Sequence, residues 1–289
     1  MQQLRVQLDA SALDEVEALL LSCGALSLCL EEDGVSNPIF EPPIGDHPLW
    51  PKLYISALFE HLIAAELSIK ALAHHAQVGT QVLLETIDET DWQAKFQQQF
   101  NAKHYGKLWV YPSWQENPAP EGISLKLDPG LAFGTGKHPT TDLCLHWLGK
   151  QDLAQVSVLD FGCGSGILAL AAAKLGAQPV VAIDIDPQAL RATEQNRDAN
   201  DISPDQVYVA TANDIVGQRF SVVVANILAG PLVELRDQFV TLLLPKGELI
   251  LSGILSSQVD DIKAAYSEYF DLVSVEIQED WARIAYKLS

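Results

Sequence analysis

From residue 156 onward, short apolar runs alternate with longer amphipathic segments. Strand patterns occupy residues 156–161, 179–184, 206–213, 220–227 and 247–254, helical patterns separate most of them, and residues 271–288 have the pattern of two antiparallel strands. Strands that alternate with helices form a parallel sheet covered on both faces. Such sheets bind ligands at the carboxyl ends of their strands. The sequence therefore predicts an α/β domain whose functional residues lie at these strand ends.

The first 88 residues repeat a strand-helix-strand pattern twice. The predicted strands are residues 4–9, 25–32, 52–60 and 81–88, and the predicted helices are residues 11–24 and 61–76. This order is typical of the ferredoxin-like α+β fold. Ser11 is expected to cap the first helix, with Asp14 three residues later.

A connecting helix is predicted between the two parts. Trp92, Phe96 and Phe100 lie four residues apart, which places them on one face of a helix. We therefore divide the chain into a ferredoxin-like domain (1–88), a linker helix (89–100) and an α/β domain (101–289). Residues 107–114 and 122–130, which open the last domain, have the pattern of a hairpin-like pair of strands.

Composition limits the partners and the compartment. The formal net charge is -20, so the chain should repel nucleic acid and attract a basic partner. The four cysteines form no Cys-x-x-Cys pair, no metal site is expected, and isolated thiols fit a reducing cytosol. The start resembles no signal peptide, and charged residues interrupt the most apolar N-terminal run. We expect a cytoplasmic monomer with no direct nucleic-acid or membrane partner.

A glycine-rich turn, "DFGCGSGIL", ends the first strand of the α/β domain. Enzymes that bind S-adenosylmethionine carry an acid followed by x-G-x-G-x-G, which Asp160, Gly162, Gly164 and Gly166 satisfy. Dinucleotide-binding enzymes carry G-x-G-x-x-G/A, which Gly164, Gly166 and Ala169 satisfy. The first pattern matches more residues and suits a ligand without phosphate. A site for S-adenosylmethionine is therefore favoured over a dinucleotide site and over a turn with a purely structural role. The Asp160 carboxylate could orient the loop or bind an amino group.

Polar residues also end the second and third strands. Asp184 is placed to accept hydrogen bonds from ribose hydroxyls, which both cofactor classes carry. Asp186 precedes Pro187, a pair that favours a helix cap over a ligand role. Asn213 and Asp214 could meet an adenine edge or cap a turn.

Asn226 ends the fourth strand, after a run of apolar residues. A polar amide at the end of a buried strand, beside the glycine turn, is a functional candidate. Methyltransferases that act on glutamine or nucleobase nitrogens often have Asn-Pro-Pro-aromatic here. This chain has Asn-Ile-Leu-Ala, which argues against such acceptors.

The stretch "LDPGLAFGTGKHPTT" contains Gly-Lys but is not a phosphate loop. The Walker pattern requires glycine where Leu131 stands and Ser or Thr where His138 stands, and a phosphate loop follows a sheet strand rather than preceding the first one. Phe133 is an aromatic residue suited to covering a flat ligand. Thr141, at a helix start, could hydrogen-bond a ligand.

Together, "LDPGLAFGTGKHPTT", "DFGCGSGIL", "AIDIDPQAL" and "VVANILAGPL" resemble the bacterial ribosomal protein L11 methyltransferases, over essentially the whole chain. The resemblance implies a class I methyltransferase fold with a mostly parallel seven-stranded sheet, and an N-terminal domain that recognises the substrate protein. It implies transfer of methyl groups from S-adenosylmethionine to lysine ε-amines and the N-terminal α-amine of free ribosomal protein L11, a basic protein.

By position, the family's cofactor contacts fall on four residues of this chain, Thr141, Gly162, Asp184 and Asn226. Phe133 and His138 occupy loop positions that approach the cofactor in the family. Lys137 is a departure, because relatives often have a neutral polar residue there.

Asn226 is the expected catalytic residue, because its side-chain oxygen can accept amine hydrogens. His138 is a less favoured general base, since loss of the amine proton to water before attack is a sufficient account. Two rival readings are a nicotinamide-dependent oxidoreductase and a non-catalytic binding module that kept the cofactor fold.

Overall fold

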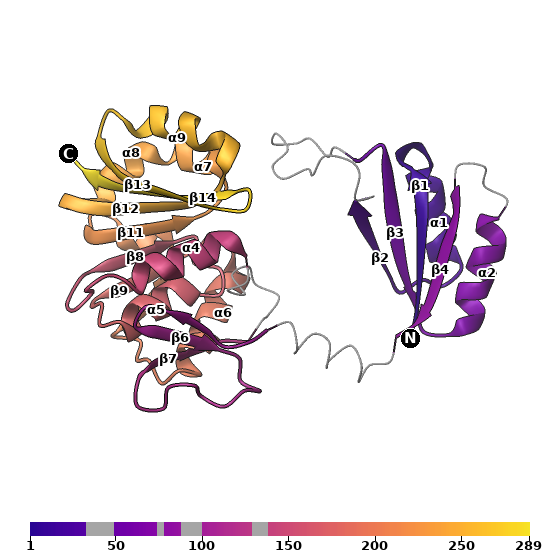
Figure 1. Ribbon diagram of the computed structural model, residues 1–289, viewed down its shortest axis with the longest axis horizontal. Coiled ribbons are helices and arrows are strands. Elements are labelled where there is room, and N and C mark those ends of the chain that lie inside the picture. The colour runs from indigo at the N-terminus through magenta and orange to yellow at the C-terminus, as the bar shows by residue number, and fades with distance from the viewer. Residues whose placement is uncertain (33–48, 74–77, 88–99, 129–137) are drawn as a thin grey trace. The chain divides into compact units, whose positions relative to one another are not determined.

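The computed structural model of the protein describes residues 1–32, 49–73, 78–87, 100–128 and 138–289. The chain divides into two compact units, Met1–Gln98 and Gln99–Ser289, and each is described by itself (Figure 1). The predicted linker helix, apart from Phe100, falls outside the described residues, as do Phe133 and Lys137. Within the described ranges, no helix has the length and apolar character needed to cross a membrane.

In its described residues, unit 1 has a four-stranded antiparallel sheet and two α-helices. Its elements are β1 (Gln2–Asp9), α1 (Leu13–Ser22), β2 (Ser27–Glu32), β3 (Lys52–Phe59), α2 (Leu62–Leu72) and β4 (Val78–Thr86). The strand order β2-β3-β1-β4 interleaves two β-α-β units, as in the split β-α-β pattern. Alternate residues of β1, such as Leu4 and Val6, are fully buried and pack with Val16 and Leu20 of α1.

The predicted cap of α1 is wrong. Ser11 lies inside a short 3-10 turn (Ala10–Ala12), and α1 begins after it with Ala12 as the N-cap and no side-chain cap hydrogen bond. The 3-10 turn continues directly into the α-helix, so Ser11 is not at the boundary that a capping hydroxyl requires.

Unit 2 opens with a small sheet of β5 (Lys103–Tyr105), β6 (Leu108–Tyr111) and β7 (Ile123–Lys126). The prediction of a hairpin formed by the last two is wrong, because β6 and β7 are parallel. The hairpin partner of β6 is β5, and Gly106, with a φ of 61°, lies in the tight turn between them. The connection from β6 to β7 is long enough for the chain to return and pair in the parallel direction.

The predicted seven-stranded sheet of unit 2 is confirmed (Figure 1). Its strands are β8 (Val158–Phe161), β9 (Val180–Ile183), β10 (Val207–Ala210), β11 (Phe220–Asn226), β12 (Leu243–Leu255), β13 (Phe270–Gln278) and β14 (Trp281–Leu288). They are ordered β10-β9-β8-β11-β12-β14-β13. The neighbours from β10 to β12 pair in parallel, and β14 is antiparallel to both of its neighbours.

Helices cover both faces of this sheet. They are α4 (Pro139–Leu148), α5 (Ile167–Lys174), α6 (Pro187–Asp198), α7 (Ala229–Glu234), α8 (Arg236–Leu242) and α9 (Val259–Tyr266). Consecutive strand residues enter different cores: Val158 packs in the core that includes α4 and α5, and Leu159 packs in the core that includes α7, α8 and α9. Between β11 and β12 the chain forms two short helices, α7 and α8, which meet at Leu235.

Candidate functional site

The turn after β8 approaches its neighbours closely. The backbone N–H groups of Gly162 and Cys163 both donate to the carbonyl of Ile183, at 2.8 and 3.0 Å. Gly162 has a φ of 77°, and a Cβ placed there would lie 2.4 Å from the Cγ2 of Ile227. Both the left-handed backbone and the close contact require glycine, so the turn exposes backbone where another residue would place a side chain.

Asp160 lies beneath this turn with a side chain that is almost completely buried. Its Oδ2 accepts a hydrogen bond from the N–H of Ala169 in α5, at 2.9 Å. Its Oδ1 is buried and has no hydrogen-bond partner among the described residues. Burial raises the pKa of Asp160 to about 7; the Ala169 hydrogen bond opposes this shift and the charge of Asp184 adds to it. The site therefore holds a buried acceptor oxygen that suits a cationic amino group.

Asp184, directly after β9, joins the two loops at this edge of the sheet. Its Oδ2 accepts from the N–H of Gly164, and its Oδ1 accepts from the N–H of Asp186, both at 2.9 Å. The predicted cap at Asp186 is confirmed, because its side chain accepts from the N–H of Gln188 at the start of α6. Between these two acids lies Ile185, which is 99% exposed and was not among the residues predicted from the sequence. The sequence feature that could have identified Ile185 is an apolar residue in an otherwise polar loop.

The third strand places its polar residues differently. Asn213 is exposed in a 3-10 turn (Ala212–Ile215) after β10. Asp214 accepts hydrogen bonds from the N–H and the hydroxyl of Thr211, at 2.9 and 2.7 Å, so it caps that turn. These bonds hold the pKa of Asp214 below its usual value. Of this pair, Asn213 keeps its side chain available to a ligand and Asp214 is engaged in the cap.

Asn226 ends β11 and meets the first turn of α4. Its Nδ2 donates to the hydroxyl of Thr141 at 3.3 Å, and its side chain is 9% exposed. Its Oδ1 is buried without a hydrogen-bond partner in the part of the chain that the structure describes. In the neighbouring strand β12, Ser252 pairs with Asn226, and its hydroxyl hydrogen is shared between the carbonyls of Thr140, at 3.2 Å, and Ala282, at 3.1 Å. The turn of α4 is thus fixed to two strand ends, and the Asn226 oxygen remains able to accept a hydrogen bond.

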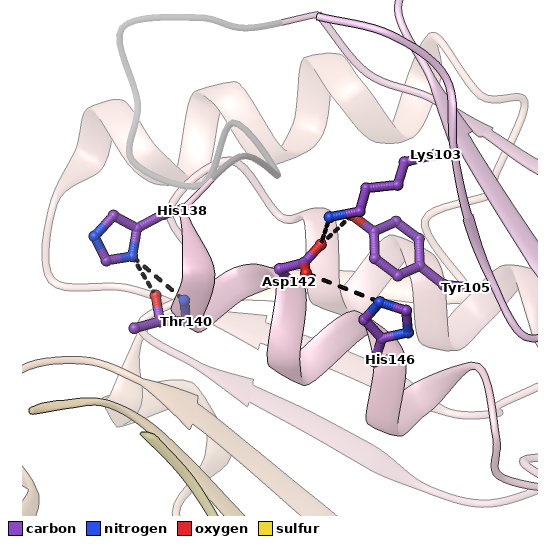
Figure 2. Close-up of polar contacts among 6 residues, drawn as sticks. All are labelled: Lys103, Tyr105, His138, Thr140, Asp142 and His146. Atoms are coloured by element: carbon purple, nitrogen blue, oxygen red, sulfur yellow. Dashed lines mark hydrogen bonds and ion pairs between the residues drawn. The ribbon is translucent and has the colours of Figure 1, made fainter. Parts of the chain in front are cut away.

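His138 caps the same helix and reaches a third strand. Its Nδ1 accepts from the N–H of Thr140 and lies 2.8 Å from the Thr140 hydroxyl (Figure 2). Its ring meets the ring of Trp281, the first residue of β14, edge to face at a centroid distance of 4.8 Å. Burial lowers the pKa of His138, although the charge of Glu279 opposes the shift. His138 is therefore neutral at pH 7, and its Nδ1 is used by the helix cap.

Gly253 is a site residue that the sequence analysis missed. The pairing of β12 with β14 shifts between Ser252 and Ile254, so Gly253 forms a bulge. Its φ is 83°, and a Cβ there would lie 2.2 Å from the carbonyl oxygen of Ile227. Ile227 is thus held between Gly162 on one side and Gly253 on the other, which fixes the backbone next to Asn226. A single glycine inside a strand pattern was the available signal.

The sheet order, with β14 as its antiparallel strand, and the glycine turn beside an acid at the end of the next strand define a class I S-adenosylmethionine-dependent methyltransferase. A family model described as ribosomal protein L11 methyltransferase (PrmA) matches residues 1–289. The chain belongs to this family, and S-adenosylmethionine is its methyl donor.

Individual relatives agree with this assignment. The ribosomal protein L11 methyltransferase of Pseudomonas paraeruginosa is 45% identical over 289 residues, covering 98% of this chain and 97% of the relative. That of Cellvibrio japonicus is 43% identical over 286 residues, covering 98% and 96%. A crystal structure of a ribosomal protein L11 methylase from Lactobacillus delbrueckii subsp. bulgaricus is similar with a TM-score of 0.59 and 32% identity, covering 66% of this chain and all of that one. The rival oxidoreductase reading is not favoured.

Proposed function

We propose that this enzyme methylates amino groups of ribosomal protein L11, namely lysine ε-amines and the N-terminal α-amine. The observation that carries the proposal is the buried Oδ1 of Asn226, which has no hydrogen-bond partner within the described ranges. An amine acceptor presents N–H groups and a lone pair, so a single acceptor oxygen at the end of β11 suits it. The names of the relatives, matched over almost the whole chain, support ribosomal protein L11 as the substrate.

We assign the cofactor to the strand ends around this oxygen. Gly162 and Gly164 provide the backbone cradle, and Asp184 would hold the ribose hydroxyls. The free Oδ1 of Asp160 would receive the cationic amino group, directly or through water.

On the remaining sides, Asn213 and the exposed Ile185 would flank the adenine. The hydroxyl of Thr141 and the ring of His138 would border the cofactor from α4. Phe133, which falls outside the described residues, completes the assignment as a cover.

The cofactor would supply a methyl group activated by its sulfonium, and the protein would position the acceptor amine in line with that methyl group. A free lysine amine has a pKa of about 10.4, so it must lose a proton before it can attack. The Asn226 side-chain oxygen would accept a hydrogen bond from the neutral amine. This hydrogen bond would aim the lone pair of the amine nitrogen at the methyl group. His138 has its Nδ1 engaged by Thr140, so we assign it no role as a base.

Unit 1 would recognise the substrate protein. In the domain division proposed from the sequence, residues 1–88 recognise the substrate, residues 89–100 form a linker helix and residues 101–289 carry out catalysis. The net charge of -20 would steer the enzyme toward a free, basic protein in the cytoplasm. We propose that the enzyme acts as a monomer, with no direct contact to nucleic acid or membrane.

The test is transfer of labelled methyl groups to purified ribosomal protein L11, with mass mapping of the modified amines. Asn226→Ala should abolish transfer even at saturating S-adenosylmethionine, while the melting temperature largely persists; cofactor affinity should fall as well, because Asn226 is also an assigned cofactor contact. Near-normal turnover in that variant would remove Asn226 from the mechanism. Absence of label with the native enzyme would refute the substrate assignment.

A further inference from the structure

Asp142 follows Thr141 directly and lies in a cluster that the proposed mechanism does not use. Its side chain is 4% exposed, although it carries a carboxylate. Lys103 and Tyr105, both in β5, donate hydrogen bonds to its Oδ1, the tyrosine at 2.8 Å. Its Oδ2 lies 3.8 Å from the Nε2 of His146, one turn further along α4 (Figure 2). One buried carboxylate thus connects the first strand of unit 2 to the first turn of α4.

The cluster keeps this carboxylate ionised. Burial by itself would raise the pKa of Asp142, but the hydrogen bonds from Lys103, Tyr105 and Gln278 and the charge of Lys103 lower it overall. Burial and the contact with Asp142 raise the pKa of Tyr105, so its hydroxyl remains a donor at any pH the protein meets. Loss of one partner would leave this buried charge less well compensated, so these contacts resist rearrangement.

The opposite side of the same helical turn meets the sheet through weaker contacts. Among the described residues, Thr141 receives one side-chain hydrogen bond, of 3.3 Å, from Asn226. Thr140 receives one of 3.2 Å at its carbonyl from Ser252. Neutral hydrogen bonds of this length are weak beside one that involves a charged group. The stronger restraint on the position of the turn therefore comes from Asp142.

We propose that Asp142 is a positioning residue: held by Lys103 and Tyr105, it fixes the first turn of α4 so that Thr141 meets Asn226, and it thereby sets the affinity for S-adenosylmethionine. The inference rests on the proposed cofactor site, because it acts through Thr141. Lys103 is the residue of this cluster best suited to substitution, because its side chain is half exposed and can be replaced without opening the core.

The experiment measures the dissociation constant of S-adenosylmethionine for the full chain by calorimetry. Lys103→Met should weaken binding about threefold to tenfold, which is less than the direct loss of a hydrogen bond to a charged group would cause, because Lys103 is half exposed and acts through Asp142. It should leave kcat at saturating cofactor, and the KM for ribosomal protein L11, within about twofold, because Thr141 contributes equally to ground and transition states. Lys103→Arg should restore native affinity.

A matched control is available in the same unit. Lys263, with a 41% exposed side chain, pairs with Asp260 at 3.0 Å on the surface of α9. Lys263→Met removes a similar ion pair in a helix that carries none of the assigned site residues, and it should leave cofactor affinity unchanged. If Lys103→Met weakens binding no more than Lys263→Met does, or lowers only the melting temperature, the positioning role is wrong.

A double-mutant cycle tests the route of the effect. In an Asp142→Asn or a Thr141→Val background, Lys103→Met should cause little further loss of cofactor affinity. Full additivity in both backgrounds would overturn the proposal. If Thr141→Val alone leaves the affinity unchanged, the proposed cofactor site fails at that residue; if it weakens binding and Lys103→Met does not, only the role of Asp142 fails.

Discussion

Replacement of Gly253 by alanine tests the geometry that holds the backbone beside Asn226. Gly253 and Gly217 have nearly equal φ values, 83° and 82°. A Cβ at Gly253 would lie 2.2 Å from the Ile227 carbonyl oxygen, whereas one at Gly217 meets nothing within 4 Å in the described part of the chain beyond its own neighbours. Both replacements therefore incur the left-handed backbone cost of about 1–2 kcal/mol, and only Gly253→Ala adds a collision.

The collision has a calculable size. The Ile227 carbonyl must move by roughly 1 Å to reach an ordinary contact distance. Overpacking of this kind costs about 1–3 kcal/mol. In a unit of this size that corresponds to about 2–12 °C in Tm. A displacement of about 1 Å next to a catalytic group can also lower kcat about 100-fold.

The assay compares thermal melts and methyl transfer for Gly253→Ala and Gly217→Ala. We expect Gly253→Ala to melt at the lower temperature and to lose most of its turnover, and Gly217→Ala to retain turnover. If the two variants melt within about 2 °C of each other and both keep kcat within about threefold of native, Ile227 is not held as described, and the link to Asn226 is refuted.

The remaining predictions concern charge and capping. The pKa of Asp160 is raised from 3.8 to about 7, so its carboxyl is neutral below about pH 7. The affinity for the cationic cofactor should therefore rise as pH increases through about 7. Calorimetry should show that Asp160→Asn abolishes this pH dependence. The free protein should lose stability as pH rises from about 4 to about 7, since its folded state binds that proton more tightly than the unfolded state does. Asp186→Ala should cost about 1 kcal/mol of stability in denaturant titration by removing the cap of α6, while Asp184→Ala should weaken cofactor binding; equal cofactor effects would contradict the two roles. The KM for ribosomal protein L11 should rise with salt, and an unchanged value between low and high ionic strength would exclude electrostatic steering.

Local signals in the sequence were enough to locate many residues of the candidate site at the ends of strands. The glycine turn follows a buried strand directly, so Gly162 and Asp160 could be placed from residues beside them. Asp186 precedes Pro187, and that pair alone specifies a helix start. Asn226 could be found because it is the first polar side chain after a buried run. Each of these depends on residues a few positions away.

The rest depends on contacts between distant residues. Thr141 and Asn226 are 85 positions apart, and Ser252 is 112 positions from Thr140, so no periodic pattern could pair them. The collision at Gly253 involves a carbonyl of another strand, which the glycine itself does not reveal. Asp142 resembled an ordinary acid in a first helical turn, and only the fold brings β5 against it. The direction of β7 likewise depended on the path of the loop before it.

The first turn of α4 restricts where insertions and deletions can occur in the sequences of this family. Its successive residues meet the ends of β11, β12 and β14, and Asp142 meets β5. An α-helix rotates by about 100° per residue, so one residue inserted between His138 and Asp142 would turn these contacts away from their partners together. Insertions and deletions among active relatives should therefore fall outside positions 138–142. The connection between β6 and β7, by contrast, should accept them.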